Sequence, residues 1–300
     1  MSVNNLSPII LFVYNRPEHT RKTVEALQKN ILAAKSKLFI YSDGAKSDND
    51  EKKINNVRSY LKTVKGFAKI DIIQRDENLG LADSVISGVN EVFNHYEKVI
   101  VLEDDILTSK NFLNFINLAL NFYVDDKRIY SISGYNFPIK IPLSYFYKVY
   151  ISPRASSWGW ATWKDRWKNA IWKPETVFNV RDKKSLRNLL DKAGTDLVPM
   201  LQKAIDGKID SWAVKWVFTH IINDAFCIYP IRSFVNNIGV DATGTNFKRK
   251  IAKFDVEIVE DNDIKMLEKD LKYSDEIQSQ INSLVNIGTI RRVINFMMKY

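Results

Sequence analysis

The first 135 residues alternate short apolar runs with segments of helical periodicity, and this alternation restricts the fold more than any other feature of the chain. The apolar runs that we interpret as buried strands are 9–14, 38–41, 70–73 and 99–102. A further helix over about 109–124 and a strand over 129–133 are predicted after them. Strands that alternate with helices through short links predict a mostly parallel sheet with helices on its faces.

Local signals support the helices of this half. Pro17 suits a first helical turn and predicts a helix that continues to about Lys29. Asp48 and Glu51 have the spacing of a capping box. The next predicted helix has apolar residues at three- and four-residue spacings, which is typical of one buried helical face. These residues are Ala82, Val85, Ile86, Val89, Val92, Phe93 and Tyr96.

Polar residues follow three of the predicted strands directly. They are Asn15 and Arg16, then Asp43, and then the acidic triplet Glu103-Asp104-Asp105. Ligands of open parallel sheets bind at the carboxyl ends of the strands, so we expect these side chains to share one edge. Neighbouring carboxylates repel and raise one another's pKa values, and a hard divalent cation removes that cost. The triplet therefore predicts a Mg²⁺ or Mn²⁺ site that also takes phosphate oxygens; a solvated acidic turn is the alternative.

Five motifs occur in an order that resembles one enzyme family. They are Phe12–Pro17, Tyr41–Gly44, Glu77–Ala82, Val101–Asp105 and Ser156–Trp163. Across residues 8–245 the chain resembles GT-A inverting glycosyltransferases, specifically bacterial family 2-like enzymes and N-acetylglucosaminyltransferase I. The resemblance implies a GT-A fold, in which a mostly parallel α/β sheet is flanked by helices and followed by a C-terminal helical extension.

The resemblance also implies roles for individual residues. Asp105 would be the metal ligand, Asp104 would contact the ribose or the sugar, and Glu103 would contact hydroxyls of the donor sugar. Arg16 would reach the nucleotide or its phosphates, and Asp43 would accept a hydrogen bond from the base. The remaining substrate-binding expectations are Asn78, Gly80, Trp158 and Trp160. The alternatives are a surface cation at Arg16, a turn former at Asp43, and loop punctuation at Asn78 and Gly80.

Asp210 is the candidate catalytic base, by its match to the family's catalytic aspartate and by its position before an apolar helix predicted over about 210–223. Amide dipoles at a helix N-terminus keep a carboxylate ionised, and the alternative is an ordinary N-cap. The resemblance departs at Asn246, where relatives often have a histidine that helps bind the metal or diphosphate.

From Ser144 onward the chain is interpreted as aromatic loops and helices, and a tryptophan-rich stretch begins at Trp158. Trp158 and Trp160 flank Gly159, so a mobile loop could place an indole against a sugar, or the two rings could anchor the loop in the core. Trp163 and Trp167 are expected in the core. Cys227 lies in an apolar run and is expected to be a small buried hydrophobe. The histidines, interpreted as structural, are His19, His95 and His220.

These observations predict one main domain over 1–253, with a nucleotide-sugar-binding half over 1–135 and an acceptor-binding half over 136–253. A helical extension over 254–300 follows. The expected activity is metal-dependent transfer of a hexose or N-acetylhexosamine from a nucleoside diphosphate, UDP foremost, to a saccharide hydroxyl in bacterial surface polysaccharide or lipopolysaccharide synthesis. The alternative is a non-catalytic nucleotide- or sugar-binding module on the same fold.

Composition and motifs bear on the other classes of protein to which the chain could belong. The 44 basic and 35 acidic residues give a formal charge of +9, which suits an anionic partner. Nucleic acid is not expected, because no compact nucleic-acid-reading motif occurs and the triplet would repel phosphate. A nucleotidyltransferase would need a glycine-rich basic loop after the first strand, which Asn15-Arg16-Pro17 is not. We expect a cytoplasmic protein, with 289–300 either contacting the inner membrane face or packing on protein.

Overall fold

The computed structural model describes residues 6–178, 180, 182–240, 252–260 and 267–286. The strands of its main sheet are β1 Ile9–Val13, β2 Lys37–Ser42, β3 Lys69–Gln74, β4 Lys98–Glu103, β6 Ile129–Ser133, β7 Val149–Ser152, β8 Trp160–Trp163 and β9 Phe226–Pro230. A small ribbon joins β5 Ile106–Thr108 to β10 Val235–Asn237.

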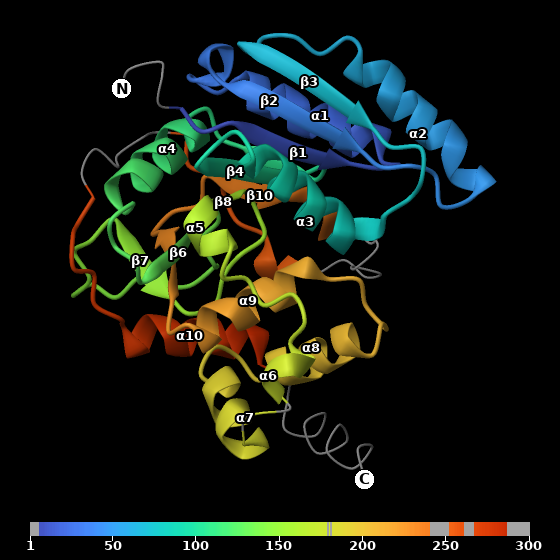
Figure 1. Ribbon diagram of the computed structural model, residues 1–300. Coiled ribbons are helices and arrows are strands. Elements are labelled where there is room, and N and C mark those ends of the chain that lie inside the picture. Colours follow the sequence, from blue (N-terminus) through green and yellow to red (C-terminus); the bar gives the residue numbers. More distant parts are fainter. Residues whose placement is uncertain (1–5, 179, 181, 241–251, 261–266, 287–300) are drawn as a thin grey trace.

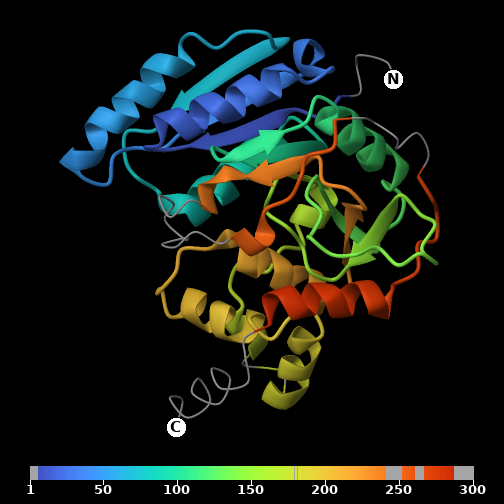
Figure 2. The same ribbon diagram turned by 180° about the vertical axis from the view of Figure 1, so that it is seen from behind.

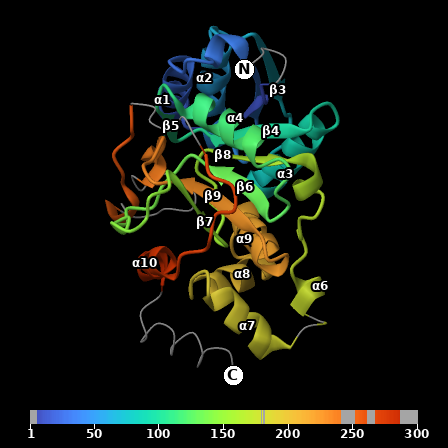
Figure 3. The same cartoon turned by 90° about the vertical axis from the view of Figure 1, so that its left-hand side faces the viewer.

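Some helices cover the faces of this sheet, and others lie beyond its edge. They are α1 Pro17–Gln28, α2 Asp48–Leu61, α3 Gly80–Phe93, α4 Phe112–Phe122, α5 Lys164–Trp167, α6 Glu175–Phe178, α7 Lys183–Asp191, α8 Leu197–Ile205, α9 Trp212–Ile222 and α10 Asp275–Val285. Short 3-10 turns occur at Ala33–Lys35, Ile238–Val240 and Ala252–Phe254. Helices α7 and α8 lie at the end of the molecule remote from β1, β2 and β3 (Figure 3).

The order of the described strands is β3-β2-β1-β4-β8-β6-β9-β7 (Figure 1). Pairings β1–β2, β2–β3, β1–β4 and β6–β9 are parallel, whereas β4–β8, β6–β8 and β7–β9 are antiparallel. The predicted α/β class, with a mostly parallel sheet flanked by helices, is confirmed. Every residue of β1 is buried, as expected of a strand covered on both faces.

The direction of the chain reverses between β1 and β4. From β1 the chain proceeds outward through β2 to β3, and it then returns to the other side of β1 as β4. Right-handed crossovers therefore place α1 and α2 on one face and α3 on the other. Figure 2 shows α1 and α2 on the near face, and Figure 1 shows α3 on the opposite one. Such a reversal leaves a crevice at the carboxyl ends of β1 and β4.

The second half contains strands that the sequence did not reveal. The expectation of aromatic loops and helices from Ser144 onward is wrong for β8, which lies between β4 and β6. All four residues of β8 are buried, so the strand lacks the polar–apolar alternation that would mark it. β7, β9 and β10 also form there. The helix predicted from Ser109 starts at Phe112, because β5 and its connection come first.

The segment after residue 251 is joined to the body by buried contacts. The hydroxyl of Tyr135 donates to the carbonyl of Phe254 at 2.8 Å, and Ser152 donates to Gln278 of α10 at 2.7 Å. Ile277 and Ile281 of α10 are buried. None of the described helices is long and apolar enough to cross a bilayer.

Three expectations about the core are confirmed. Cys227 lies in β9 and is buried as a free thiol, and burial raises its pKa to about 12. His220 is also buried and is held between the hydroxyl of Ser131 and the carbonyl of Trp216, each at 2.8 Å. Burial lowers the pKa of His220 to about 4, so it is a neutral structural side chain. Trp163 and Trp167 are buried as predicted.

Candidate active site

The acidic triplet begins at the carboxyl end of β4, beside the carboxyl end of its neighbour β1. Glu103 ends β4, and Asp104 and Asp105 form the turn into β5. Arg16, which follows β1, places its Nη1 atom 2.8 Å from Oδ2 of Asp105 and 3.8 Å from Oδ1 of Asp104. The hydroxyl of Thr23 in α1 donates to the carbonyl of Asp104 at 2.8 Å, which fixes the turn. The predicted convergence of Arg16 with the triplet is therefore present in the structure.

Three carboxylates in a half-buried crevice are poorly accommodated as anions. Burial, followed by repulsion from Asp105 and Asp104, raises the pKa of Glu103 to about 8. Burial and Asp105 raise the pKa of Asp104 to about 7. Burial also raises the pKa of Asp105, although the Arg16 guanidinium opposes this shift. If all three carboxylates were ionised they would carry more negative charge than Arg16 neutralises, and an added cation would stabilise that ionised form.

These raised pKa values lead to a prediction for the protein freed of divalent cations with EDTA: its free energy of unfolding should fall as the pH rises. The folded pKa of Glu103 lies near 8, against an ordinary value of 4.5. Between these values the folded state binds more protons than the unfolded state, so raising the pH favours unfolding. Glu103→Gln should therefore unfold at higher denaturant than the wild type at pH 8, by at least about 1.4 kcal/mol, the equivalent of one pKa unit.

Urea titrations at pH 5 and pH 8 measure this difference. At pH 5 the two proteins should be nearly equal, because Glu103 is then protonated in the folded state. Glu97→Gln is the matched control, since Glu97 is an exposed residue just before β4. This variant retains Glu103, so its stability should fall with pH as that of the wild type does. A stability gain of Glu103→Gln that is the same at both pH values would contradict the prediction.

The ligands that the site offers to a divalent cation are the carboxylates of the triplet. Among the described residues, no group of three or more His, Cys, Asp and Glu side chains is arranged to enclose a metal ion. Mg²⁺ is commonly held by only one or two carboxylates together with substrate phosphates, which the triplet can supply. Atom Oδ1 of Asp105 is buried and accepts no hydrogen bond from any described residue. The donor set thus fits a cation that shares its coordination with a phosphate-bearing substrate.

The segment after β10 packs against Asp105. The amide of Ile238 donates to the carbonyl of Asp105 at 2.9 Å. A Cβ at position 239 would overlap the Asp105 carboxylate and lie 3.0 Å from Nη1 of Arg16, so Gly239 is required for this close approach. Sequence reasoning did not identify this contact.

Asp43 follows β2 and holds the start of α3. Its carboxylate accepts hydrogen bonds from the backbone of Leu79 at 3.1 Å and of Gly80 at 3.2 Å, and from Nδ2 of Asn78 at 3.1 Å. Burial raises the pKa of Asp43, and these backbone donors oppose the rise. Asp43, Asn78 and Gly80 are thus brought together as one unit, in which the carboxylate orders the loop. Its contact with a nucleotide base stays a prediction.

Asp210 lies at the start of α9 but does not cap that helix. The N-cap is Ser211, whose side chain accepts from the amide of Val214, so the N-cap interpretation of Asp210 is wrong. Instead, the exposed Asp210 carboxylate accepts from the amides of Leu81 at 2.6 Å and Ala82 at 3.1 Å, at the N-terminus of α3. The carboxylate therefore lies at the N-terminus of α3 and not at that of its own helix. Asp210 thereby joins the two halves of the chain.

The two tryptophans expected in a loop have different surroundings. Trp160 is 0% exposed, lies in β8, and stacks on Trp212 at a ring distance of 4.8 Å. Its placement in a mobile loop is therefore wrong, because both neighbouring strands and the tryptophan cluster enclose it. Trp158 is half-buried and packs edge-on against Tyr135 at 4.6 Å. Contact between Trp158 and a sugar stays a prediction.

Two further residues join the site that sequence reasoning did not identify. The side chain of Trp212, buried in α9, hydrogen-bonds to Glu103 and lowers its pKa against the larger effect of burial. Asp50 of α2 accepts from the Tyr14 hydroxyl at 3.1 Å and from Asn15 at 2.7 Å, which fixes the residues before Arg16. The only sequence signal for the role of Trp212 was its position two residues after Asp210. Asn246 and the segment 289–300 lie outside the described residues.

Comparisons with known proteins add limited information. No protein-family model and no curated protein sequence matches this chain. Among solved structures, the chain is similar to the mannosyltransferase PcManGT from Pyrobaculum calidifontis in complex with GDP-Man and Mn²⁺, at 13% identity and a TM-score of 0.37 over 54% of this chain and 46% of that one. It is also similar to S. aureus TarS 1–349, at 10% identity and a TM-score of 0.41 over 76% of this chain and 59% of that one.

A second TarS structure from S. aureus matches at 13% identity and a TM-score of 0.36, over 57% of this chain and 31% of that one. The chain thus spans less than two thirds of each of these structures. Likeness at this level does not assign the chain to a family.

Proposed function

We propose that this chain is a metal-dependent inverting glycosyltransferase. It moves a hexose or N-acetylhexosamine from a nucleoside diphosphate, UDP foremost, to a saccharide hydroxyl in the synthesis of a bacterial surface polysaccharide or lipopolysaccharide. The observation that carries the proposal is the convergence of Arg16, Glu103, Asp104 and Asp105 in the crevice where the sheet reverses. In this assignment residues 1–135 bind the donor and 136–253 bind the acceptor.

The charges of the crevice suit a diphosphate that arrives with a divalent cation. Bound Mn²⁺ or Mg²⁺ would act as a Lewis acid that stabilises the negative charge of the departing diphosphate. Asp105, with its unpartnered buried Oδ1 atom, is the residue assigned to hold the cation. Arg16 offers a planar guanidinium that can bind phosphate oxygens in pairs. Glu103 and Asp104 are assigned to the hydroxyls of the sugar and ribose.

Asp210 is assigned as the base. The acceptor hydroxyl oxygen forms the new bond to the anomeric carbon, the bond from that carbon to the diphosphate breaks, and the hydroxyl proton passes to the Asp210 carboxylate. Two observations support the assignment: the carboxylate is exposed, and Trp212, two residues on, contacts Glu103. Its hydrogen bonds to Leu81 and Ala82 hold the carboxylate in one orientation.

Thermal unfolding with UDP, GDP or dTDP, each with and without Mn²⁺, tests the donor and cation assignments. We expect one nucleotide to raise Tm by about 5 °C or more at about 100-fold its Kd, and only when Mn²⁺ is present. Asp105→Asn should lose this cation-dependent rise, whereas the exposed Asp125→Asn should keep it. The proposal fails if no nucleotide stabilises the wild type in the presence of Mn²⁺ or Mg²⁺.

A further inference from the structure

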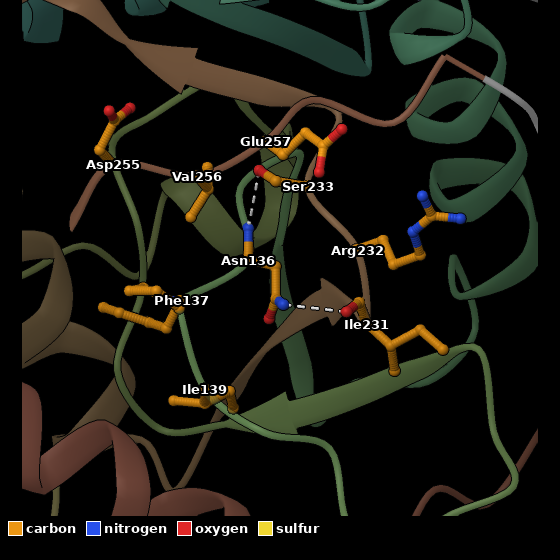
Figure 4. Close-up of a pocket in the computed structure, with 10 residues that line it drawn as sticks. Asn136, Phe137, Ile139, Ile231, Arg232, Ser233, Asp255, Val256 and Glu257 are labelled. Carbon is orange, nitrogen blue, oxygen red and sulfur yellow. Dashed lines mark hydrogen bonds between the residues drawn. The ribbon is translucent and has the colours of Figure 1, made fainter. Parts of the chain in front are cut away.

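A cavity of about 310 Å³ lies apart from the acidic triplet, where three segments of the chain meet (Figure 4). One segment follows β6, the second follows β9, and the third follows the 3-10 turn at Ala252–Phe254. The lining residues are Asn136, Phe137, Pro138, Ile139, Ile231, Arg232, Ser233, Asp255, Val256 and Glu257. In Figure 4, Asn136 lies between Phe137 on one side and Ile231 and Arg232 on the other.

Buried hydrogen bonds hold this cavity in shape. The amide of Asn136 donates to the hydroxyl of Ser233 at 3.1 Å, and its Nδ2 atom donates to the carbonyl of Ile231 at 2.9 Å. The hydroxyl of Tyr150 in turn donates to Oδ1 of Asn136 at 2.9 Å. The segments after β6 and β9 are therefore fastened to each other, and a ligand would meet a preformed surface.

The lining combines an apolar floor with charged side chains at the rim. Phe137 and Val256 supply carbon surface, while Arg232, Asp255 and Glu257 are exposed. Asp255 accepts a hydrogen bond from Asn236 at 2.6 Å. No hydrogen bond or ion pair joins Arg232 or Glu257 to another side chain in the described part of the protein. Carboxylates accept from sugar hydroxyls and guanidinium donates to them, while the C–H faces of a sugar pack on apolar side chains.

The same rim disfavours an anionic ligand. Two carboxylates against one guanidinium leave the cavity with local negative charge, although the chain as a whole carries +9. A phosphorylated or uronate-containing saccharide would bring like charge to Asp255 and Glu257. The lining therefore favours an uncharged saccharide.

The cavity is connected to the acidic triplet by one continuous stretch of chain. β6 runs in the same direction as β4, because β8 is antiparallel to both, and β9 is parallel to β6. The segments that line the cavity thus leave the sheet at the carboxyl ends of strands, as the triplet does. From Ser233 the chain passes through β10 to Ile238, which contacts Asp105. The five residues from Ser233 to Asn237 span about 13 Å when extended.

We propose that this cavity binds a neutral saccharide unit of the acceptor, remote from the hydroxyl that reacts. The assignment to an acceptor rests on the proposed function. A unit held beside Glu257 and Arg232 would fix the acceptor chain so that another unit reaches the proposed active site. The cavity then contributes to acceptor affinity and selectivity, and it takes no part in binding or cleaving the donor.

Calorimetric titration with chitotriose, maltotriose, cellotriose and mannotriose tests binding to the wild type, with trigalacturonate as the anionic counterpart. We expect at least one neutral trisaccharide to bind, and to bind more tightly than trigalacturonate. The double variant Arg232→Ala/Glu257→Ala should raise its Kd at least about tenfold, because hydrogen bonds to charged groups are lost. Arg187→Ala/Glu260→Ala, two exposed residues outside the cavity, is the matched control.

Donor hydrolysis, with water as the acceptor, separates this inference from the proposed function. The cavity variant should hydrolyse the donor at the wild-type rate while its KM for the saccharide rises. If no donor is hydrolysed but the cavity variant still weakens trisaccharide binding, the proposed function fails and the saccharide site stands. The inference is overturned if no neutral trisaccharide binds, if trigalacturonate binds as tightly, or if the cavity and control variants bind alike.

Discussion

Asp210→Asn is expected to lower the rate of sugar transfer by about 10²–10⁴-fold, the usual contribution of a positioned general base. Asparagine preserves the shape of the side chain but cannot take the proton of the acceptor hydroxyl. Its amide oxygen can still accept from Leu81 or Ala82, so the start of α3 should remain in place. The loss should therefore appear in kcat for transfer, with nucleotide binding in the presence of Mn²⁺ changed much less.

Asp224→Asn is the matched control for this variant. Asp224 follows the other end of α9, is exposed, and has a φ of 50°, a left-handed conformation that asparagine tolerates well. It should transfer sugar at the wild-type rate. If Asp210→Asn transfers at the wild-type rate too, Asp210 only fastens α3 to α9. The alternative of a non-catalytic sugar-binding module gains support only if the wild type itself transfers no sugar.

Trp160→Ala is expected to destabilise the protein by about 3–5 kcal/mol, the cost of removing a large aromatic ring from a core. Trp160 stacks on Trp212 at 4.8 Å and on Trp167 at 5.5 Å, and both neighbours are themselves buried. The free energy of unfolding in urea measures the loss. Trp158→Ala should cost less, because Trp158 is only half-buried.

Trp160→Phe distinguishes packing from polar contacts at this position. The indole N–H of Trp160 is buried without a hydrogen-bond partner among the described residues, so phenylalanine removes an unsatisfied donor while it keeps an aromatic ring. We therefore expect Trp160→Phe to lose much less stability than Trp160→Ala. A loss below about 1 kcal/mol for Trp160→Ala would contradict its burial and would favour the loop position predicted from the sequence.

Prediction from the sequence succeeded in the first half of the chain and failed around Trp160. In the first half, apolar runs and helical spacings predicted β1 to β4 and α1 to α3 within a few residues, because each signal is contained within its own segment. The stretch from Trp158 to Trp163 carries no such signal. It becomes a strand only because β4 and β6 pair with it from both sides.

The candidate site divides in the same way. The sequence by itself determined that Arg16, Asp43 and the triplet share one edge, since a βαβ order with right-handed crossovers leaves few arrangements of the strand ends. Only the tertiary structure decided that Asp210 contacts the amide of Leu81, 129 positions away, and that Trp212 contacts Glu103. These pairings depend on how α9 packs against α3, and side-chain packing between distant segments leaves no periodic trace in either one.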